Sequence, residues 1–199
     1  MSAFLGPIHH WVFRKVKFQN EVTDQLIDFA RHKNLDTAPM LAEKYGELEE
    51  APLEDIIDRL NIHGWLQERV SLVEYRLAAA VKAILDNGIA EEDELRKLFY
   101  DIGASMKQAA LPSASAAYEL LNDLLLDGMP CDGANELLSE DDGKVVWRRN
   151  ICVHSPYWKE AGVDIAVYYV IRESMIEGLL EGSDYEFAKQ GEEYSIKGR

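Results

Sequence analysis

Asn-Ile-Cys-Val-His-Ser-Pro-Tyr-Trp-Lys-Glu-Ala-Gly-Val-Asp-Ile-Ala-Val-Tyr-Tyr, residues 150–169, is the stretch in which the pattern of the chain changes from strand to helix. The residues before it alternate between apolar and polar, whereas the residues after it repeat with helical spacing. No other window holds as many side chains that can bind or react: Cys152, His154, Tyr157, Trp158, Tyr168 and Tyr169. Because ligands often bind where strands lead into helices, this stretch is the first candidate for a functional site.

A hairpin is predicted immediately upstream of this stretch. Asp142-Gly143 supplies the positive φ that a tight turn needs, between extended segments at residues 135–139 and 145–153. In the second segment the odd-numbered side chains are the more apolar, so that side is expected to face the main core. The even-numbered side carries groups that can bond or react: Arg148, Asn150, Cys152 and His154.

The even-numbered side has two interpretations. If a helix at residues 164–180 covers it, these groups line a polar-floored cavity whose aromatic walls are Trp158 and Tyr169. Arg148 would then need an anionic partner, which a carboxylate ligand, Asp164 or Glu173 could supply, because an unpaired buried charge is costly. The alternative is that this side faces solvent.

The chain before the hairpin is predicted to be helical. Apolar residues recur with helical spacing and indicate helices at residues 8–32, 37–45, 52–86, 91–110 and 114–126. Asn61 and Gly64 are expected to bend the third of these. After the hairpin, Ser155-Pro156 begins a helix that Gly162 interrupts, Asp164 restarts it, and a last hairpin is expected around Gln190-Gly191.

These patterns predict an α+β fold that is mainly α. Residues 1–88 form a bundle-like, all-helical part, and residues 89–199 form an α+β part in which a small antiparallel sheet packs on helices. No linker rich in glycine, serine or proline separates the parts. We therefore expect the two parts to pack as one body.

Composition limits the classes of function. The 199 residues carry a net charge of −15, with 36 acidic against 21 basic residues, which disfavours nucleic acids and anionic membrane surfaces. Apolar runs are far shorter than the roughly 20 residues of a membrane span, and the first residues lack the pattern of a signal peptide. A cytoplasmic protein is expected, in which Cys131 and Cys152 are free thiols.

A local repeat places histidine and tryptophan at matching positions. Ile8-His9-His10-Trp11-Val12 aligns with Ile62-His63-Gly64-Trp65-Leu66, 54 residues later. In one interpretation the two helices pack side by side and His9 and His63 share a metal ion or a tetrapyrrole. In the other, each histidine bonds a nearby carbonyl or carboxylate, and each tryptophan belongs to the core. The Glu-x-x-His and His-Glu-x-x-His motifs typical of helical metal sites are absent.

Cys152 and His154 are the candidates for catalysis. One residue separates them, which on a strand places both on the same face, so His154 could serve as the base for a Cys152 nucleophile. A soft-metal site that includes Cys131 is a second possibility, and a wall position in a ligand pocket is a third. Further candidate acids are Asp127, Asp132 and Asp164, of which Asp164 is more simply a helix N-cap. The aromatic residues 157, 158, 168 and 169 line a cavity or belong to the core.

The order of elements in the second half resembles the aminothiazoline-carboxylate hydrolase-like family and the related vinyl-reductase-type ligand domains. The residues that carry the resemblance are Cys152, after the hairpin, and Gly-Ser-Asp-Tyr-Glu-Phe at 182–187, within a match over residues 94–187. The later cysteines of that family have no counterpart here, which puts hydrolase activity in doubt. The resemblance implies a small-molecule pocket between the hairpin and the long helix.

These observations lead to one expected function and two alternatives. The first is a small-molecule-binding protein, or a hydrolase of a small heterocycle or carboxylate, with Arg148, Asn150, Tyr157, Trp158, Asp164, Tyr168 and Tyr169 as ligand-binding residues. The second is a homodimeric interaction or regulatory protein, paired through the apolar faces of helices 8–32 and 52–86. The third is metal or haem binding through His9 and His63.

Overall fold

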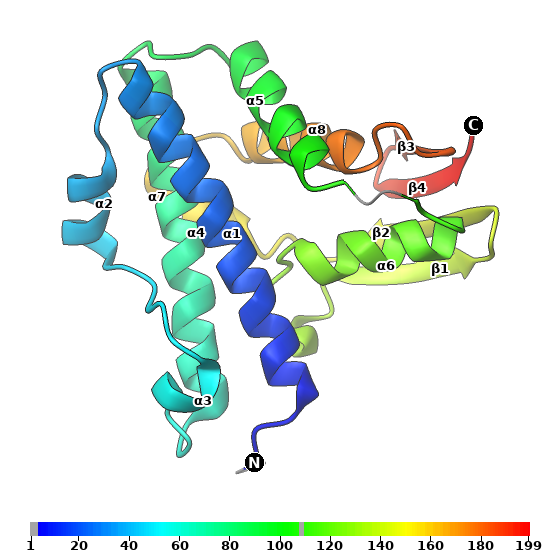
Figure 1. Cartoon of the computed structure of the whole chain (residues 1–199), viewed down its shortest axis with the longest axis horizontal. Coiled ribbons are helices and arrows are strands. Elements are labelled where there is room, and N and C mark those ends of the chain that lie inside the picture. Colours follow the sequence, from blue (N-terminus) through cyan, green and yellow to red (C-terminus); the bar gives the residue numbers. More distant parts are fainter. Residues whose placement is uncertain (1–3, 108–109) are drawn as a thin grey trace.

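The computed structural model describes residues 4–107 and 110–199, and it confirms an α+β fold that is mainly α. The helices are α1 (Pro7–His32), α2 (Ala38–Tyr45), α3 (Leu53–Ile56), α4 (Ile62–Asp86), α5 (Glu92–Ser105), α6 (Ala114–Leu124), α7 (Ser155–Ala161) and α8 (Ile165–Leu179), with a short 3-10 turn at Pro130–Asp132. The strands are β1 (Asn135–Glu140), β2 (Lys144–Arg149), β3 (Tyr185–Gln190) and β4 (Glu193–Gly198). Figure 1 shows the long helices α1 and α4 side by side, with the sheet at the opposite end of the molecule.

Three predicted boundaries were wrong. The helix expected at 52–86 is divided into α3 and α4, because Asn61 acts as the N-cap of α4 and its side chain accepts from the Gly64 N–H. The helix expected at 91–110 ends at Ser105, and residues 108–109 of that prediction lie outside the described residues. The strand expected at 145–153 ends at Arg149, since β1 pairs with it only as far as Asn135.

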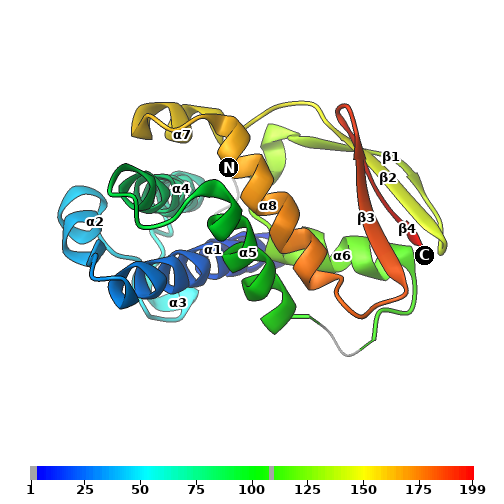
Figure 2. The same ribbon diagram turned by 90° about the horizontal axis from the view of Figure 1, so that it is seen from above.

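The sheet is antiparallel with strand order β1-β2-β4-β3. The predicted turn forms, with the Asp141 carboxylate accepting from the N–H groups of Gly143 and Lys144, both at 2.8 Å. Figure 2 shows α6 and α8 on the same side of the sheet. On that side Val145 and Trp147 are buried, so the odd-numbered side of β2 faces the core as predicted.

Two glycines bring α5 and α8 into close contact. A Cβ atom on Gly103 would lie 2.2 Å from the Met175 carbonyl oxygen, and one on Gly178 would lie 2.1 Å from the Tyr100 carbonyl oxygen. No side chain fits at either position, because real Cβ contacts are never this short. The contact fixes α8, which carries Tyr168, Tyr169 and Arg172 of the candidate site.

The larger hydrophobic core joins both parts of the chain. It includes Leu26 of α1, Ile84 of α4, Ile171 of α8 and Ile196 of β4, each at most 1% exposed. Buried residues of α1 and α4 pack in this core and in a smaller one within one chain. Within residues 4–107 and 110–199, the helices are too short or too polar to cross a bilayer.

Candidate functional site

Polar side chains that are buried or nearly so gather between α4, α8 and the segment that joins α6 to α7. This polar cluster consists of Glu74, Asp127, His154, Tyr168 and Arg172. His154 lies at its centre: Nδ1–H donates to Glu74 Oε1 at 3.0 Å, and Nε2 lies 3.3 Å from Asp127 Oδ1 and 3.0 Å from Tyr168 Oη. The cluster connects α4, in the all-helical part, to elements of the α+β part.

The surroundings of His154 favour its charged form. Burial lowers the pKa of this imidazole, but the charge of Glu74 and the hydrogen bonds to Asp127 and Glu74 raise it by more, so the net pKa lies above its ordinary value. Neighbouring charges also determine the ionisation of Asp127. Burial raises the pKa of this carboxyl, but Arg172 and His154 lower it by more, so the net pKa lies well below its usual range. The cluster therefore favours the charged forms of His154, Asp127 and Arg172, each of which stabilises the charge beside it.

Arg172 makes three side-chain hydrogen bonds within this cluster. Its Nη2–H donates to Asp127 Oδ2 at 2.7 Å, and its Nη1–H groups donate to Tyr168 Oη at 2.9 Å and to the Leu126 carbonyl at 3.1 Å. Burial raises the pKa of Tyr168, so the phenol stays protonated. Asp127 lies between Arg172 and His154, and His154 also contacts Glu74, so the cations of the cluster already have anionic partners and it is not itself an open anion site. Glu74 Oε2 is buried and has no hydrogen-bond partner among the described residues.

A groove of about 310 Å³ lies beside this cluster, at the end of β2. Its lining residues are Arg149, Asn150, Cys152, Tyr169, Lys189, Gly191, Glu192 and Tyr194. Arg149 lies over two aromatic rings, with its guanidinium carbon 4.0 Å from the centroid of Tyr169 and 4.8 Å from that of Tyr194. Its Nη1–H donates to the Tyr194 hydroxyl at 2.6 Å.

Arg149 differs from the other cations of the site in its partners. Arg172 pairs with Asp127, and Lys189 pairs with Glu173 at 2.5 Å. The ion pairs formed by the described residues include no carboxylate within 4.0 Å of Arg149. A smaller hollow of about 30 Å³ is lined by Arg149 and by Asp127, so the groove and the polar cluster adjoin.

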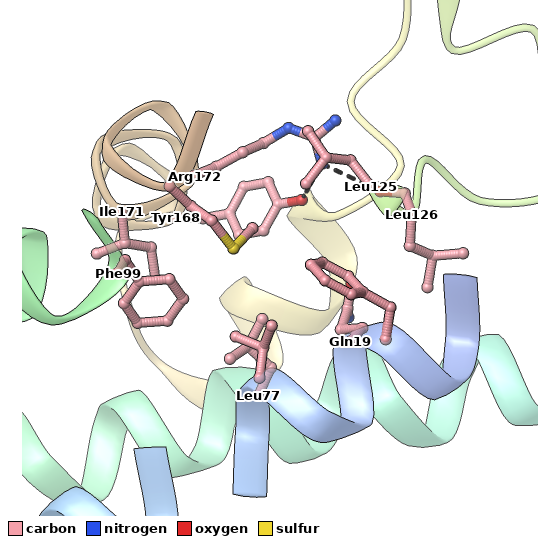
Figure 3. Close-up of a pocket in the computed structure, with 11 residues that line it drawn as sticks. Gln19, Leu77, Phe99, Leu125, Leu126, Tyr168, Ile171 and Arg172 are labelled. Carbon is pink, nitrogen blue, oxygen red and sulfur yellow. Dashed lines mark hydrogen bonds between the residues drawn. The ribbon is translucent and has the colours of Figure 1, made fainter. Parts of the chain in front are cut away.

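A third space, about 20 Å³ and mainly apolar, lies inside the helices (Figure 3). Phe99, Leu77 and Gln19 surround it, with Tyr168 and Arg172 from α8 on one side. Gln19 is 7% exposed, and its Nε2 has no hydrogen-bond partner among the described residues. This volume suffices for about one water molecule and not for a metabolite.

Cys152 and His154 do not form the predicted nucleophile–base pair. The Tyr169 O–H donates to Cys152 Sγ at 2.8 Å, whereas both nitrogens of His154 are directed into the polar cluster. Cys131 is exposed and Cys152 is half-buried, and both are free thiols. The even-numbered side of β2 is not covered by α8 either: Arg148 is exposed and pairs with Glu136 at 2.7 Å.

The remaining predicted residues have mixed positions. Asn150 and Tyr169 line the groove, and Tyr168 belongs to the polar cluster. Trp158 is completely buried, and the Tyr157 hydroxyl lies 3.0 Å from Ser71 Oγ, so neither reaches the groove. Two candidate acids are caps: Asp164 accepts from the Ala166 N–H, and Asp132 accepts from the Met129 N–H.

His9 and His63 meet, as one interpretation of the repeat predicted, but without His154. Their Nε2 atoms are 3.2 Å apart. The Gly6 N–H donates to His9 Nδ1 at 2.9 Å, so in neutral His9 the proton is on Nε2 and is donated to His63. A metal on His9 Nε2 would require a proton on Nδ1, which this contact opposes. Within the described residues, no group of three or more His, Cys, Asp or Glu side chains could hold a metal.

Sequence reasoning missed Glu74, Arg149 and Arg172. Glu74 and Arg172 could have been found in the sequence, because each is a charged residue on the otherwise apolar face of its helix, α4 or α8. The same signal marks Lys15 in α1, which is 4% exposed. Burial lowers the pKa of Lys15 to about 8, and its Nζ lies 3.7 Å from the Trp11 ring centroid.

Comparisons with known proteins assign no relative to this chain. No protein-family model, curated protein or solved structure matches it.

Proposed function

We propose that this protein binds a small carboxylate-bearing molecule in the groove at the end of β2. The observation that carries the proposal is Arg149, a half-buried guanidinium without an ion-pair partner among the described residues. A cation in this position gains from an anion, and a guanidinium donates two parallel hydrogen bonds to a carboxylate. The groove volume of about 310 Å³ falls at the lower end of the range for small-molecule sites.

The walls of the groove favour a flat ligand body. The rings of Tyr169 and Tyr194 both lie within 5 Å of the Arg149 guanidinium, and Lys189 Nζ lies 5.8 Å and 5.5 Å from the same two centroids. A planar acid could stack on a tyrosine while its carboxylate reaches Arg149. Cys152 lies in the wall and reports on occupancy through its thiol.

The proposal is binding and not hydrolysis. A thiol nucleophile needs a base within hydrogen-bond reach, and the group on Cys152 Sγ is the Tyr169 hydroxyl. Burial and the contact with Cys152 raise the pKa of Tyr169, so this phenol is a poor base at neutral pH. His154, the other candidate base, is held by Glu74 and Asp127.

Thiol labelling tests this proposal directly. In a Cys131→Ser background only Cys152 reacts, and we expect benzoate to slow its labelling in a saturable manner, whereas the uncharged analogue benzamide does not. Arg149→Gln should abolish the protection. Arg148→Gln is the matched control, since it removes the neighbouring arginine on the opposite face of the same strand. Equal protection by both compounds, or retained protection in Arg149→Gln, would refute the carboxylate site.

Benzoate is a probe of the class, so a wider set of acids is needed. The midpoint of thermal unfolding can be compared across a panel of small aliphatic, aromatic and heterocyclic carboxylates. The largest increase identifies the preferred group attached to the carboxylate. A ligand present at 100 times its Kd raises stability by about 2.7 kcal/mol, which is readily measured. If no acid in the panel shifts the midpoint of the wild type relative to Arg149→Gln, the groove is not a carboxylate site.

A further inference from the structure

The exposed face of α1 is a single stripe of charged residues. The stripe runs along the helix at spacings of three and four, which keeps its members on one side. Its members are His10, Arg14, Lys17, Glu21, Asp24 and Asp28, after which the exposed Arg31 pairs with Asp28 at the end of the helix. The basic residues occupy the N-terminal half of the stripe and the acidic residues the C-terminal half.

The order of these charges is complementary to its own reverse. Arg14 and Asp24, Lys17 and Glu21, and His10 and Asp28 each lie symmetrically about position 19. An antiparallel second copy of α1, related by a two-fold axis at that position, would therefore place every base opposite an acid. Each pair would occur twice, as an isologous interface requires.

The central charges of the stripe have no ion-pair partner in the part of the chain that the structure describes. The ion pairs among described residues include none for Arg14, Lys17 or Glu21. The outer members do have partners: Asp24 accepts from Asn20 Nδ2 at 2.9 Å and lies 3.8 Å from Arg76, and Asp28 pairs with Arg31 at 2.5 Å. His10 Nε2 lies 3.6 Å from Glu54 Oε1. The centre of the stripe is thus available for contacts between copies.

A hollow beside the acidic half could receive the partner's basic side chains. It has a volume of about 510 Å³, and its lining includes four carboxylates, of Glu21, Asp24, Glu49 and Glu50, against one cation, Lys17. Burial raises the pKa of Asp24, and the nearby charges of Asp28, Glu50 and Glu47 add to that increase, although Arg76 opposes it. A crowded acidic hollow of this kind gains from an added cation.

We propose that this protein self-associates through the α1 stripe, with the α1 helices of two copies antiparallel and the stripes face to face. The partner is a second copy because the stripe matches its own reverse, and because the stripe is nearly neutral while the whole chain carries −15. The long-range repulsion between two such chains is screened beyond about 8 Å at physiological salt, whereas the contacts between the stripes are shorter. The interface differs from the apolar one expected from the sequence.

Single charge reversals at the centre of the stripe test the proposal. In sedimentation velocity at 150 mM salt, over 5–200 µM of the full chain, we expect a concentration-dependent dimer. Lys17→Glu and Glu21→Lys each turn two attractive pairs into repulsive ones, and each should raise the dimer Kd by about tenfold or more. Mixed in equal amounts, the two variants should form a heterodimer at least as tight as the wild-type dimer, because both central pairs are then restored.

The controls separate this interface from other causes. Lys97→Glu on α5 changes the net charge by the same amount at an exposed site away from the stripe, and should leave the Kd unchanged. Circular dichroism melting verifies that each variant folds. A wild type that is monomeric at 200 µM, reversals that leave the Kd unchanged, or a mixture that associates no better than its components would each overturn the proposal.

Discussion

Replacing Asp127 by asparagine should destabilise the protein strongly. Asparagine keeps the shape of the side chain but removes the charge that faces Arg172 Nη2 at 2.7 Å and His154 Nε2 at 3.3 Å. Arg172 is 8% exposed and has no other carboxylate within 4.0 Å among the described residues. Removal of one partner of such a buried pair costs about 3–5 kcal/mol, because the other charge remains without compensation.

The magnitude can be measured by urea denaturation and by thermal melting. For a chain of this length about 1 kcal/mol corresponds to 2–4 °C, so the melting midpoint should fall by roughly 6–20 °C. Glu136→Gln is the matched control, since it removes the acid from the exposed Arg148 pair and should cost at most about 1 kcal/mol. The double variant Asp127→Asn with Arg172→Met should be more stable than the sum of the two single changes predicts, by about 1–3 kcal/mol.

The result that refutes this reasoning is equally clear. If Asp127→Asn loses no more stability than Glu136→Gln, the cluster does not hold a buried ion pair. If the double variant is strictly additive, Asp127 and Arg172 do not interact.

Two further predictions concern pH and the apolar cavity. The pKa of His154 is raised in the folded protein, so its contribution to stability is complete below about pH 6.5 and is lost as the pH rises through the folded-state pKa. The pKa of His9 is lowered by burial and by the charge of His63. Its contribution to stability is therefore lost as the pH falls below about 6.5. Urea denaturation from pH 5 to pH 9 should therefore show a decline at high pH that His154→Gln flattens and a decline at low pH that His9→Asn flattens; unchanged slopes would contradict these assignments. Gln19→Leu removes an unpartnered buried amide from a mainly apolar cavity and should raise the free energy of unfolding by about 1 kcal/mol. If the free energy of unfolding instead falls by about 1 kcal/mol, a bound water links Gln19 to its surroundings.

Local patterns predicted the elements well and their long-range contacts poorly. The Asp-Gly turn, the break at Gly162 and the restart at Asp164 were predicted from backbone chemistry, which depends on a few adjacent residues. Alternation in β2 correctly assigned its apolar side to the core. The end of the helix predicted at 91–110 and the division at Asn61 were missed because a helical apolar pattern continues beyond both points.

The candidate site could be located only in part. The stretch at 150–169 supplies Asn150, Cys152 and Tyr169 to the groove, but the arginine that faces inward is Arg149 and not Arg148. The alternation of apolar and polar residues along the strand already placed Arg149 on the side that faces the core. Arg149 was overlooked because the reactive side chains were all expected on the opposite, even-numbered side. The partner of His154, Glu74, is 80 residues away, and no sequence period connects two residues on different elements.

The contact between α5 and α8 has a mechanical consequence. At Gly103 and Gly178 the two backbones touch with no side chain between them, so no compressible layer can absorb a relative shift. We therefore expect α5 and α8 to move as one unit, so that a displacement of α5 displaces α8 as well. Tyr169 on the groove and Arg172 in the polar cluster would move with α8.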